Sequence, residues 1–249
     1  MQTERNPDSV WVSQLAGVSE RRSLDALRQA QEERALFRHL DRMHRLGGRA
    51  SYVEIDAPLE LYALVRLLRP DHVVEVGVSS GVSSAYLLKA MDRLDHGTLH
   101  SVDLPKIEPS RPGRPRSRFP SWALPPGRSS GWAVPFPLRK RWDLRLGDKR
   151  EVVPLLADEL SSVGLFVYDV PHAERQAGRE FMALDRRLAK GAVAIADHGP
   201  GGGLCIPLRD WATARGARPI RRTDLGLFGF RCERPPTRIP RPRTRSSRR

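Results

Sequence analysis

Residues 72–83 read HVVEVGVSSGVS, and this stretch decides the fold. Its first five residues, HVVEV, include three valines and predict a short buried strand. Gly77 and Gly81 then allow the backbone to turn sharply and to approach a ligand closely. A helical pattern begins near Val82, and the first N–H groups of that helix are free. The stretch therefore predicts a strand, a glycine-rich loop and a helix with a ligand against the loop.

The chain around this stretch alternates strand and helix patterns. Further strands are predicted at 98–102, 142–146, 165–168 and 192–196, and a closing antiparallel pair at 218–222 and 225–232. Helices are predicted at about 20–46, 61–68, 152–160 and 177–188, with a short one near 208–211. This order indicates an α/β fold, namely a Rossmann-like, doubly wound, mainly parallel seven-stranded sheet whose last strand is antiparallel, preceded by N-terminal helices.

The net charge of +14 over 249 residues lies in two proline-rich segments. Residues 105–145 hold ten basic and two acidic side chains, and residues 234–249 hold seven basic and no acidic ones. Proline disfavours long helices and central strands. We therefore expect three parts, which are an N-terminal helical extension at 1–54, a domain at 55–233 with a Pro/Arg-rich insertion at 105–141, and a disordered basic tail at 234–249.

Composition also bears on location and partners. The sequence has no apolar run of about 18–20 residues, as a membrane span needs, and no apolar N-terminal signal segment. Cys205 and Cys232 make no disulfide framework, so we expect a cytoplasmic protein. The basic segments lack regularly interleaved aromatic residues, which disfavours nucleic acid as a partner. Within the insertion, Trp122, Trp132 and Phe136 are expected to fasten its second half onto the domain.

Ligands of parallel α/β sheets bind beyond the carboxyl ends of the strands. A glycine-rich or acidic feature follows each of the five predicted parallel strands, at Gly77, Asp103, Asp148, Asp169 and Asp197. A dinucleotide fingerprint counted from Gly77 would need glycine at positions 79 and 82, where Ser79 and Val82 stand, so that class is excluded. An acid at position 103 can accept both hydroxyls of a ribose.

The E-x-G-x-x-x-G pattern of residues 75–81 resembles motif one of class I S-adenosylmethionine-dependent methyltransferases. The later acids follow in the same order as in that class, over about 55–232. More narrowly, the chain resembles methyltransferase family 24, which is related to the catechol-type O-methyltransferases. The stretches that carry this likeness are GWAVP at 131–135, RLGD at 145–148 and Asp169-x-x-His172.

The resemblance implies S-adenosylmethionine as cofactor. It implies a binding site made of Glu75, Gly77, Ser79, Gly81, Ser83, Asp103, Asp148 and Asp169. Asp103 would take the ribose hydroxyls, and Asp148 would approach the adenine ring. Glu75 would lie by the amino-acid end or the ribose, and Ser83 would bind the carboxylate. Asp169 would lie near the methionine portion or on a metal.

Two alternative groups of residues are candidates for catalysis. Catechol-type relatives hold a divalent metal on an acid after strand four and a pair after strand five, and Asp169, Asp197 and His198 occupy those positions here. The two carboxylates suit Mg²⁺, whereas the imidazole favours other divalent metals; alternatively the acids only cap loops and bind cofactor. His172 is the other candidate, as a general base or as a cap of the next helix. Pro171 stands where the family often has a polar residue.

These features predict a methyltransferase that acts on a hydroxyl of a small-molecule acceptor, and the basic insertion can attract an anionic one. Two alternatives stay open: a catalytically degenerate protein that binds the cofactor, and a nucleic-acid-associated protein that uses the basic loop and tail. The identity of the acceptor and the oligomeric state leave no signal in the sequence.

Overall fold

Seven strands form one sheet in the order β3-β2-β1-β4-β5-β7-β6. The computed structural model describes residues 6–47, 57–104, 124–125, 127–170, 174–197, 206–222 and 224–233. The strands are β1 (His72–Val76), β2 (Thr98–Asp103), β3 (Trp142–Leu146), β4 (Val163–Tyr168), β5 (Leu188–Asp197), β6 (Ile220–Arg222) and β7 (Leu227–Arg231). The last strand, β7, pairs antiparallel with both β5 and β6, as predicted, and the pairs among β1 to β5 are parallel. The strand order reverses between β1 and β4, which is where such sheets open a crevice for a ligand.

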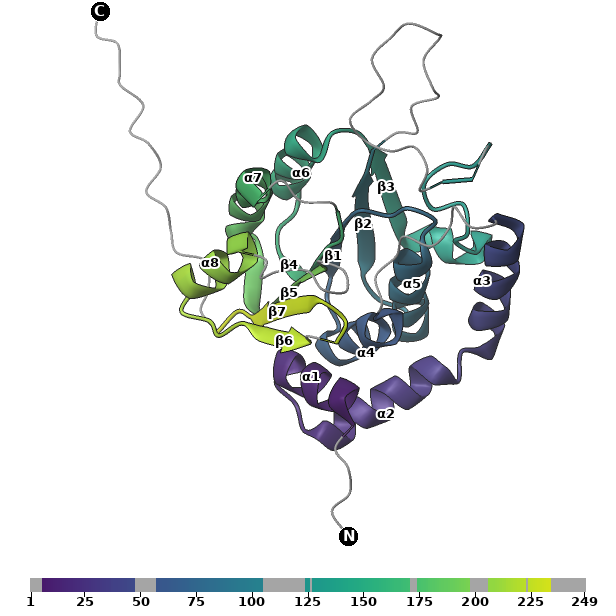
Figure 1. Ribbon diagram of the computed structural model, residues 1–249, viewed down its shortest axis with the longest axis horizontal. Coiled ribbons are helices and arrows are strands. Elements are labelled where there is room, and N and C mark those ends of the chain that lie inside the picture. The colour runs from purple at the N-terminus through teal and green to yellow at the C-terminus, as the bar shows by residue number, and fades with distance from the viewer. Residues whose placement is uncertain are drawn as a thin grey trace, which may run out of the picture.

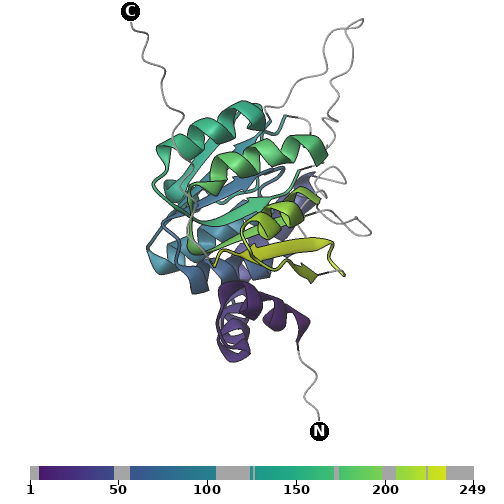
Figure 2. The same cartoon turned by 90° about the vertical axis from the view of Figure 1, so that its left-hand side faces the viewer.

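Helices cover both faces of the sheet (Figures 1 and 2). The helices α4 (Pro58–Leu68) and α5 (Val82–Leu94) pack on the face that carries Val73 and Leu165. The opposite face is covered by α6 (Lys149–Glu159), α7 (Glu174–Asp185) and α8 (Ile206–Ala214). Successive strand residues enter opposite cores because side chains alternate across a strand. None of the described helices is long and apolar enough to span a bilayer.

The N-terminal region differs from the sequence prediction. The helix predicted at 20–46 is two helices, α2 (Glu20–Gln31) and α3 (Arg34–Gly47), and α1 (Pro7–Ala16) precedes them. The break falls beside Glu33, whose buried carboxylate accepts hydrogen bonds from Arg93 and Tyr62. Helical periodicity alone could not reveal this long-range pairing.

The start of β5 also corrects the prediction. The helical pattern was expected to run to residue 188 and to be closed by Lys190 and Gly191. Instead α7 ends at Asp185, and Leu188 already belongs to β5. Gly191 has φ +82° within this strand, near a register shift between β4 and β5. The glycine therefore marks an irregularity of the strand and not a helix end.

The second half of the insertion returns to the sheet through turns and a 3₁₀ helix, η3 (Phe136–Arg141). Trp132 anchors this segment, since its side chain is 9% exposed. Phe136, which was predicted to anchor it too, is 85% exposed, so that expectation is wrong. Trp122 lies outside the described residues, as do residues 105–123 and the basic tail at 234–249.

An ion cluster around the buried side chains of Arg222 and Glu60 joins α1 to the rest of the domain. Arg222 of β6 pairs with Asp8 of α1 at 2.7 Å and with Asp224 at 2.8 Å, and its guanidinium lies 3.9 Å from Glu60 of α4. Burial, together with the nearby charge of Asp8, raises the pKa of Glu60 to about 7. An acid whose pKa is raised in the folded state loses its stabilising contribution as the pH rises.

We therefore expect the free energy of unfolding to fall between pH 4.5 and pH 7 because Glu60 ionises earlier in the unfolded chain. The substitution Glu60→Gln should increase stability at pH 8 by up to about 3 kcal/mol and change it little near pH 4. Denaturant unfolding at both pH values measures this, with the exposed Glu32→Gln as control. Equal effects of Glu60→Gln at the two pH values would contradict the assignment.

Candidate functional site

The loop between β1 and α5 is folded tightly against the end of β4. Gly77 has φ +94°, and a Cβ atom built on it would lie 1.8 Å from the Asp169 carbonyl oxygen. Gly81 has the same φ, and a Cβ there would meet Val134 at 2.6 Å. Ser79 adopts a left-handed conformation with φ +50° although it is not glycine. Both glycines are thus required by conformation and by close backbone contact.

Asp103, the last residue of β2, is held against this loop. Its Oδ2 accepts a hydrogen bond from the Ser79 amide at 3.2 Å, and its Oδ1 accepts one from the Leu104 amide at 2.9 Å. Burial raises the pKa of Asp103, whereas hydrogen bonding by the Ser130 hydroxyl and by backbone amides, including those of Leu104 and Ser79, acts in the opposite direction. The charge of this carboxylate strengthens any further hydrogen bond that it accepts, such as one from a ribose hydroxyl.

Glu75 lies beneath the loop and is fully buried. Its carboxylate accepts hydrogen bonds from the hydroxyls of Ser83 at 2.7 Å, Ser84 at 2.6 Å and Ser101 at 2.7 Å. Burial raises the pKa of Glu75, and the three hydroxyls oppose this shift. The group thus joins β1, the first turn of α5 and β2 in the interior, so neither Glu75 nor Ser83 lines an open surface.

A second segment braces the glycine-rich loop from outside. The amide of Gly131 donates to the Ser79 carbonyl at 2.9 Å, and that of Ala133 donates to the Ser80 carbonyl at 3.0 Å. His39 of α3 contacts the Ala133 carbonyl at 3.0 Å, which ties the N-terminal helices to the same place. The loop is therefore held between this segment and the strand ends.

Asp148 follows β3 and caps α6. Its carboxylate accepts from the Arg150 amide at 2.9 Å and pairs with the Arg150 side chain. Hydrogen bonding by Arg150 lowers the pKa of Asp148. The Gly147 amide donates to the Asp103 carbonyl at 2.8 Å, so Asp148 stands beside the end of β2.

Asp169 and Asp197 follow adjacent strands. Tyr168 of β4 pairs in register with Ala196 of β5, which places the next residues, Asp169 and Asp197, at neighbouring strand ends. Asp197 is buried, whereas Asp169 is partly exposed. His172 and His198 lie outside the described residues. Within the described ranges, no group of three His, Cys, Asp or Glu side chains is arranged to hold a metal.

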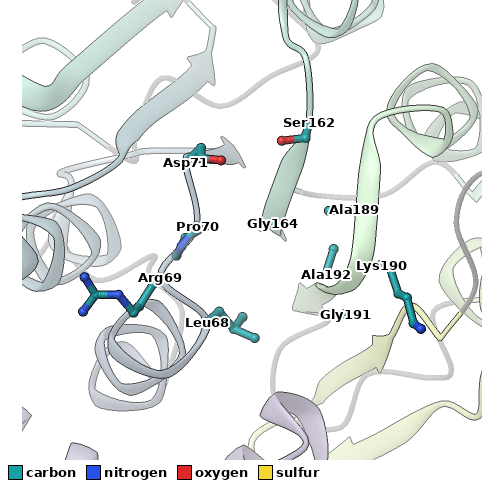
Figure 3. Close-up of a pocket in the computed structure, with 10 residues that line it drawn as sticks. All are labelled: Leu68, Arg69, Pro70, Asp71, Ser162, Gly164, Ala189, Lys190, Gly191 and Ala192. Atoms are coloured by element: carbon teal, nitrogen blue, oxygen red, sulfur yellow. The ribbon is translucent and has the colours of Figure 1, made fainter.

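A cavity of about 180 Å³ lies at the other edge of the sheet (Figure 3). It is lined near the amino ends of β1, β4 and β5 by residues that include Pro70, Gly164 and Gly191. Its two cationic residues, Arg69 and Lys190, point away from each other. This cavity is therefore separate from the strand ends where the acids gather.

The structure thus brings together the loop of residues 77–81, Asp103, Asp148 and Asp169 at the carboxyl edge, with Asp197 beside them. Two further partners of Glu75, Ser84 and Ser101, were not predicted from the sequence. The sequence of β2, TLHSVD, gave no distinct signal for Ser101, because Thr98, His100 and Asp103 on the same strand are polar too.

Two sequence comparisons define the class of protein. The family model of methyltransferase family 24, described as a methyltransferase domain, matches residues 74–198. A Mycobacteroides abscessus protein named "Putative O-methyltransferase" is 30% identical over 200 residues, which cover 80% of this chain and 76% of the relative. The chain therefore belongs to methyltransferase family 24, and the protein is an S-adenosylmethionine-dependent methyltransferase.

Solved structures share the fold. The O-methyltransferase TomG from Streptomyces achromogenes, in complex with S-adenosylmethionine, matches with a TM-score of 0.50 at 17% identity and covers 93% of this chain and 98% of its own. A Podospora anserina methyltransferase bound to S-adenosylhomocysteine matches with a TM-score of 0.53 at 12% identity, over 80% and 87% of the two chains. The predicted Rossmann-like class I fold is confirmed.

Because an added Cβ at Gly77 would meet the Asp169 carbonyl, we expect alanine to destabilise the protein more at position 77 than at a glycine with open space around it. Gly77→Ala should destabilise the protein by more than about 3 kcal/mol, because strain adds to a backbone clash. Gly127 is the matched control, since it has φ +72° but nothing within 4 Å of an added Cβ. Gly127→Ala should therefore lower the free energy of unfolding by only about 1–2 kcal/mol. Equal losses in thermal unfolding experiments would argue against the contact with Asp169.

Proposed function

We propose that the protein transfers the methyl group of S-adenosylmethionine to a hydroxyl of a small-molecule acceptor. The observation that carries the proposal is the Asp103 carboxylate, held at the carboxyl edge of the sheet against the Ser79 amide. The O-methyltransferase name of the M. abscessus relative supports the choice of oxygen as acceptor. When bound, the cofactor would supply an electrophilic methyl group: the acceptor oxygen provides the electron pair of the new C–O bond, and the electron pair of the broken C–S bond stays on sulfur.

The residues at the carboxyl edge would hold the two ends of the cofactor. Asp103 would accept hydrogen bonds from the ribose hydroxyls, and its charge would strengthen them. Asp148 lies at the adenine side, and the loop of residues 77–81 with Asp169 lies at the methionine side. Fixing the sulfonium in line with the acceptor oxygen accounts for most of what such a site contributes to rate.

Glu75 and Ser83 take a different role in this proposal from the one that the family resemblance implies. Because both oxygens of Glu75 already accept serine hydroxyls, and one of these belongs to Ser83, the pair holds the loop from beneath. We expect them to position the loop without touching the cofactor.

Proton removal from the acceptor is assigned to His172 and to Asp197, which is the last residue of β5. An imidazole titrates near neutrality and can accept the hydroxyl proton as the new bond forms. Asp169, Asp197 and His198 are the alternative, as ligands of a divalent cation that would lower the pKa of the hydroxyl. The two carboxylates at adjacent strand ends suit oxygen coordination, and His198 would supply the third donor.

We place this reaction in the cytoplasm, in keeping with Cys232, which is a free and buried thiol. The basic insertion follows Asp103 in the sequence, so it is suited to attract an anionic acceptor.

Loss of the Asp103 charge should weaken cofactor binding. We expect Asp103→Asn to raise the Kd for S-adenosylhomocysteine about 10-fold to 100-fold, because hydrogen bonds to a charged acceptor are lost. Since the pKa of Asp103 is raised, wild-type affinity should decline on acidification at a pH above the ordinary range of aspartate. Isothermal calorimetry measures both, with Asp25→Asn on α2 as control. Unchanged affinity in Asp103→Asn would refute the assignment.

Removal of the base should affect turnover and not binding. His172→Ala should lower kcat by about 10²-fold to 10⁴-fold and leave the Kd for S-adenosylhomocysteine unchanged. His96→Gln is the control, because His96 pairs with Asp71 at the opposite edge of the sheet. Full activity of His172→Ala, together with loss of activity on chelation, would transfer the role to the site of Asp169, Asp197 and His198.

A further inference from the structure

A buried polar cluster joins three elements just below the carboxyl edge of the sheet. Lys149, in the first turn of α6, donates a hydrogen bond to the Tyr168 hydroxyl at the end of β4. Tyr168 donates to Oε2 of Glu180 on α7 at 2.6 Å, and the Lys149 ammonium lies 3.4 Å from the same oxygen. We call Lys149, Tyr168 and Glu180 the α6 anchor.

The α6 anchor is enclosed by apolar side chains. Tyr168 and Glu180 are fully buried, and the Lys149 side chain is 20% exposed. Tyr168 packs edge-on against Phe181, with the ring centroids 4.9 Å apart. Burial lowers the pKa of Lys149, and the charge of Glu180 opposes the shift. Oε1 of Glu180 accepts no hydrogen bond within the described part of the chain.

Stability alone does not explain these charges. Desolvation of a buried ion pair offsets most of its attraction, and apolar residues of similar volume often serve as well or better. What the pair does provide is direction, since hydrogen bonds fix the relative position of the groups that they join.

Two residues of the α6 anchor are adjacent in sequence to acids of the carboxyl edge. Lys149 directly follows Asp148, and Tyr168 directly precedes Asp169. The helices α6 and α7 lie side by side on one face of the sheet (Figures 1 and 2). The cluster therefore ties the start of α6 to the end of β4, between two acids that the proposed function places along the cofactor.

We propose that Lys149, Tyr168 and Glu180 are positioning residues for the adenosyl half of the cofactor. The α6 anchor fixes the first turn of α6, and with it Asp148, at a set distance from the end of β4. This inference rests on the proposed function, because it assumes that the adenosyl group lies between these elements. The three side chains act through Asp148 and the α6 N-terminus and touch no ligand themselves.

The test uses two ligands that share only the adenosyl half. Calorimetry should show that Glu180→Gln weakens binding of S-adenosylhomocysteine about 10-fold. The same substitution should weaken binding of 5′-methylthioadenosine, which lacks the amino-acid end, by the same factor. Tyr168→Phe should act in the same direction with a smaller loss, of about 3-fold. Glu159→Gln is the matched control, since it removes an ion pair with Arg145 at the other end of α6 and should leave both affinities unchanged.

A double variant separates positioning from stability. Lys149→Met with Glu180→Gln removes both charges, so its melting temperature should recover toward that of the wild type, while the 10-fold loss of affinity persists. The inference is overturned if Glu180→Gln binds both ligands as the wild type does, if only S-adenosylhomocysteine is affected, or if affinity recovers together with stability. A wild-type protein that binds neither ligand would instead overturn the proposed function on which the inference rests.

Discussion

The close approach of β1 and β4 beyond their paired residues is the constraint on which the rest of the site depends. The Asp169 carbonyl oxygen occupies the space that a side chain at position 77 would need. The Asp169 amide in turn donates to the Val76 carbonyl at 2.8 Å, so β1 and β4 stay paired up to their carboxyl ends. Glycine at 77 thus allows the loop to fold over the strand ends, where the sheet order reverses and a ligand can enter.

Polar groups then hold this loop from three sides. Glu75 and its serine partners support it from the interior, Asp103 binds its backbone from β2, and the segment around Gly131 braces it from outside. A buried carboxylate is costly unless it is well hydrogen-bonded, and the three hydroxyls meet that need for Glu75. The loop is therefore rigid before any ligand arrives, which reduces the entropy lost on binding.

Sequence could predict what local pattern and strand order control. The boundaries of β1 and β3 and the start of α5 at Val82 agree with the prediction, because a glycine follows each of these strands and Gly81 directly precedes the helix. The gathering of Asp103, Asp148 and Asp169 at one edge followed from the rule for parallel sheets. Long-range contacts were beyond reach. The predicted N-terminal helix is interrupted at Glu33, whose carboxylate pairs with Arg93. Leu188 belongs to a strand and not to a helix. Phe136 faces solvent, whereas Trp132 is buried.

The central claim is that the cofactor binds at the carboxyl edge with its ribose on Asp103. A crystal structure of the protein with S-adenosylhomocysteine tests this most directly. The account predicts that both ribose hydroxyls lie within hydrogen-bond distance of the Asp103 carboxylate, with the amino-acid end over the loop of residues 77–81. Ligand density elsewhere, such as in the cavity beside Pro70 and Gly191, with Asp103 bound only to groups of the protein, would contradict it.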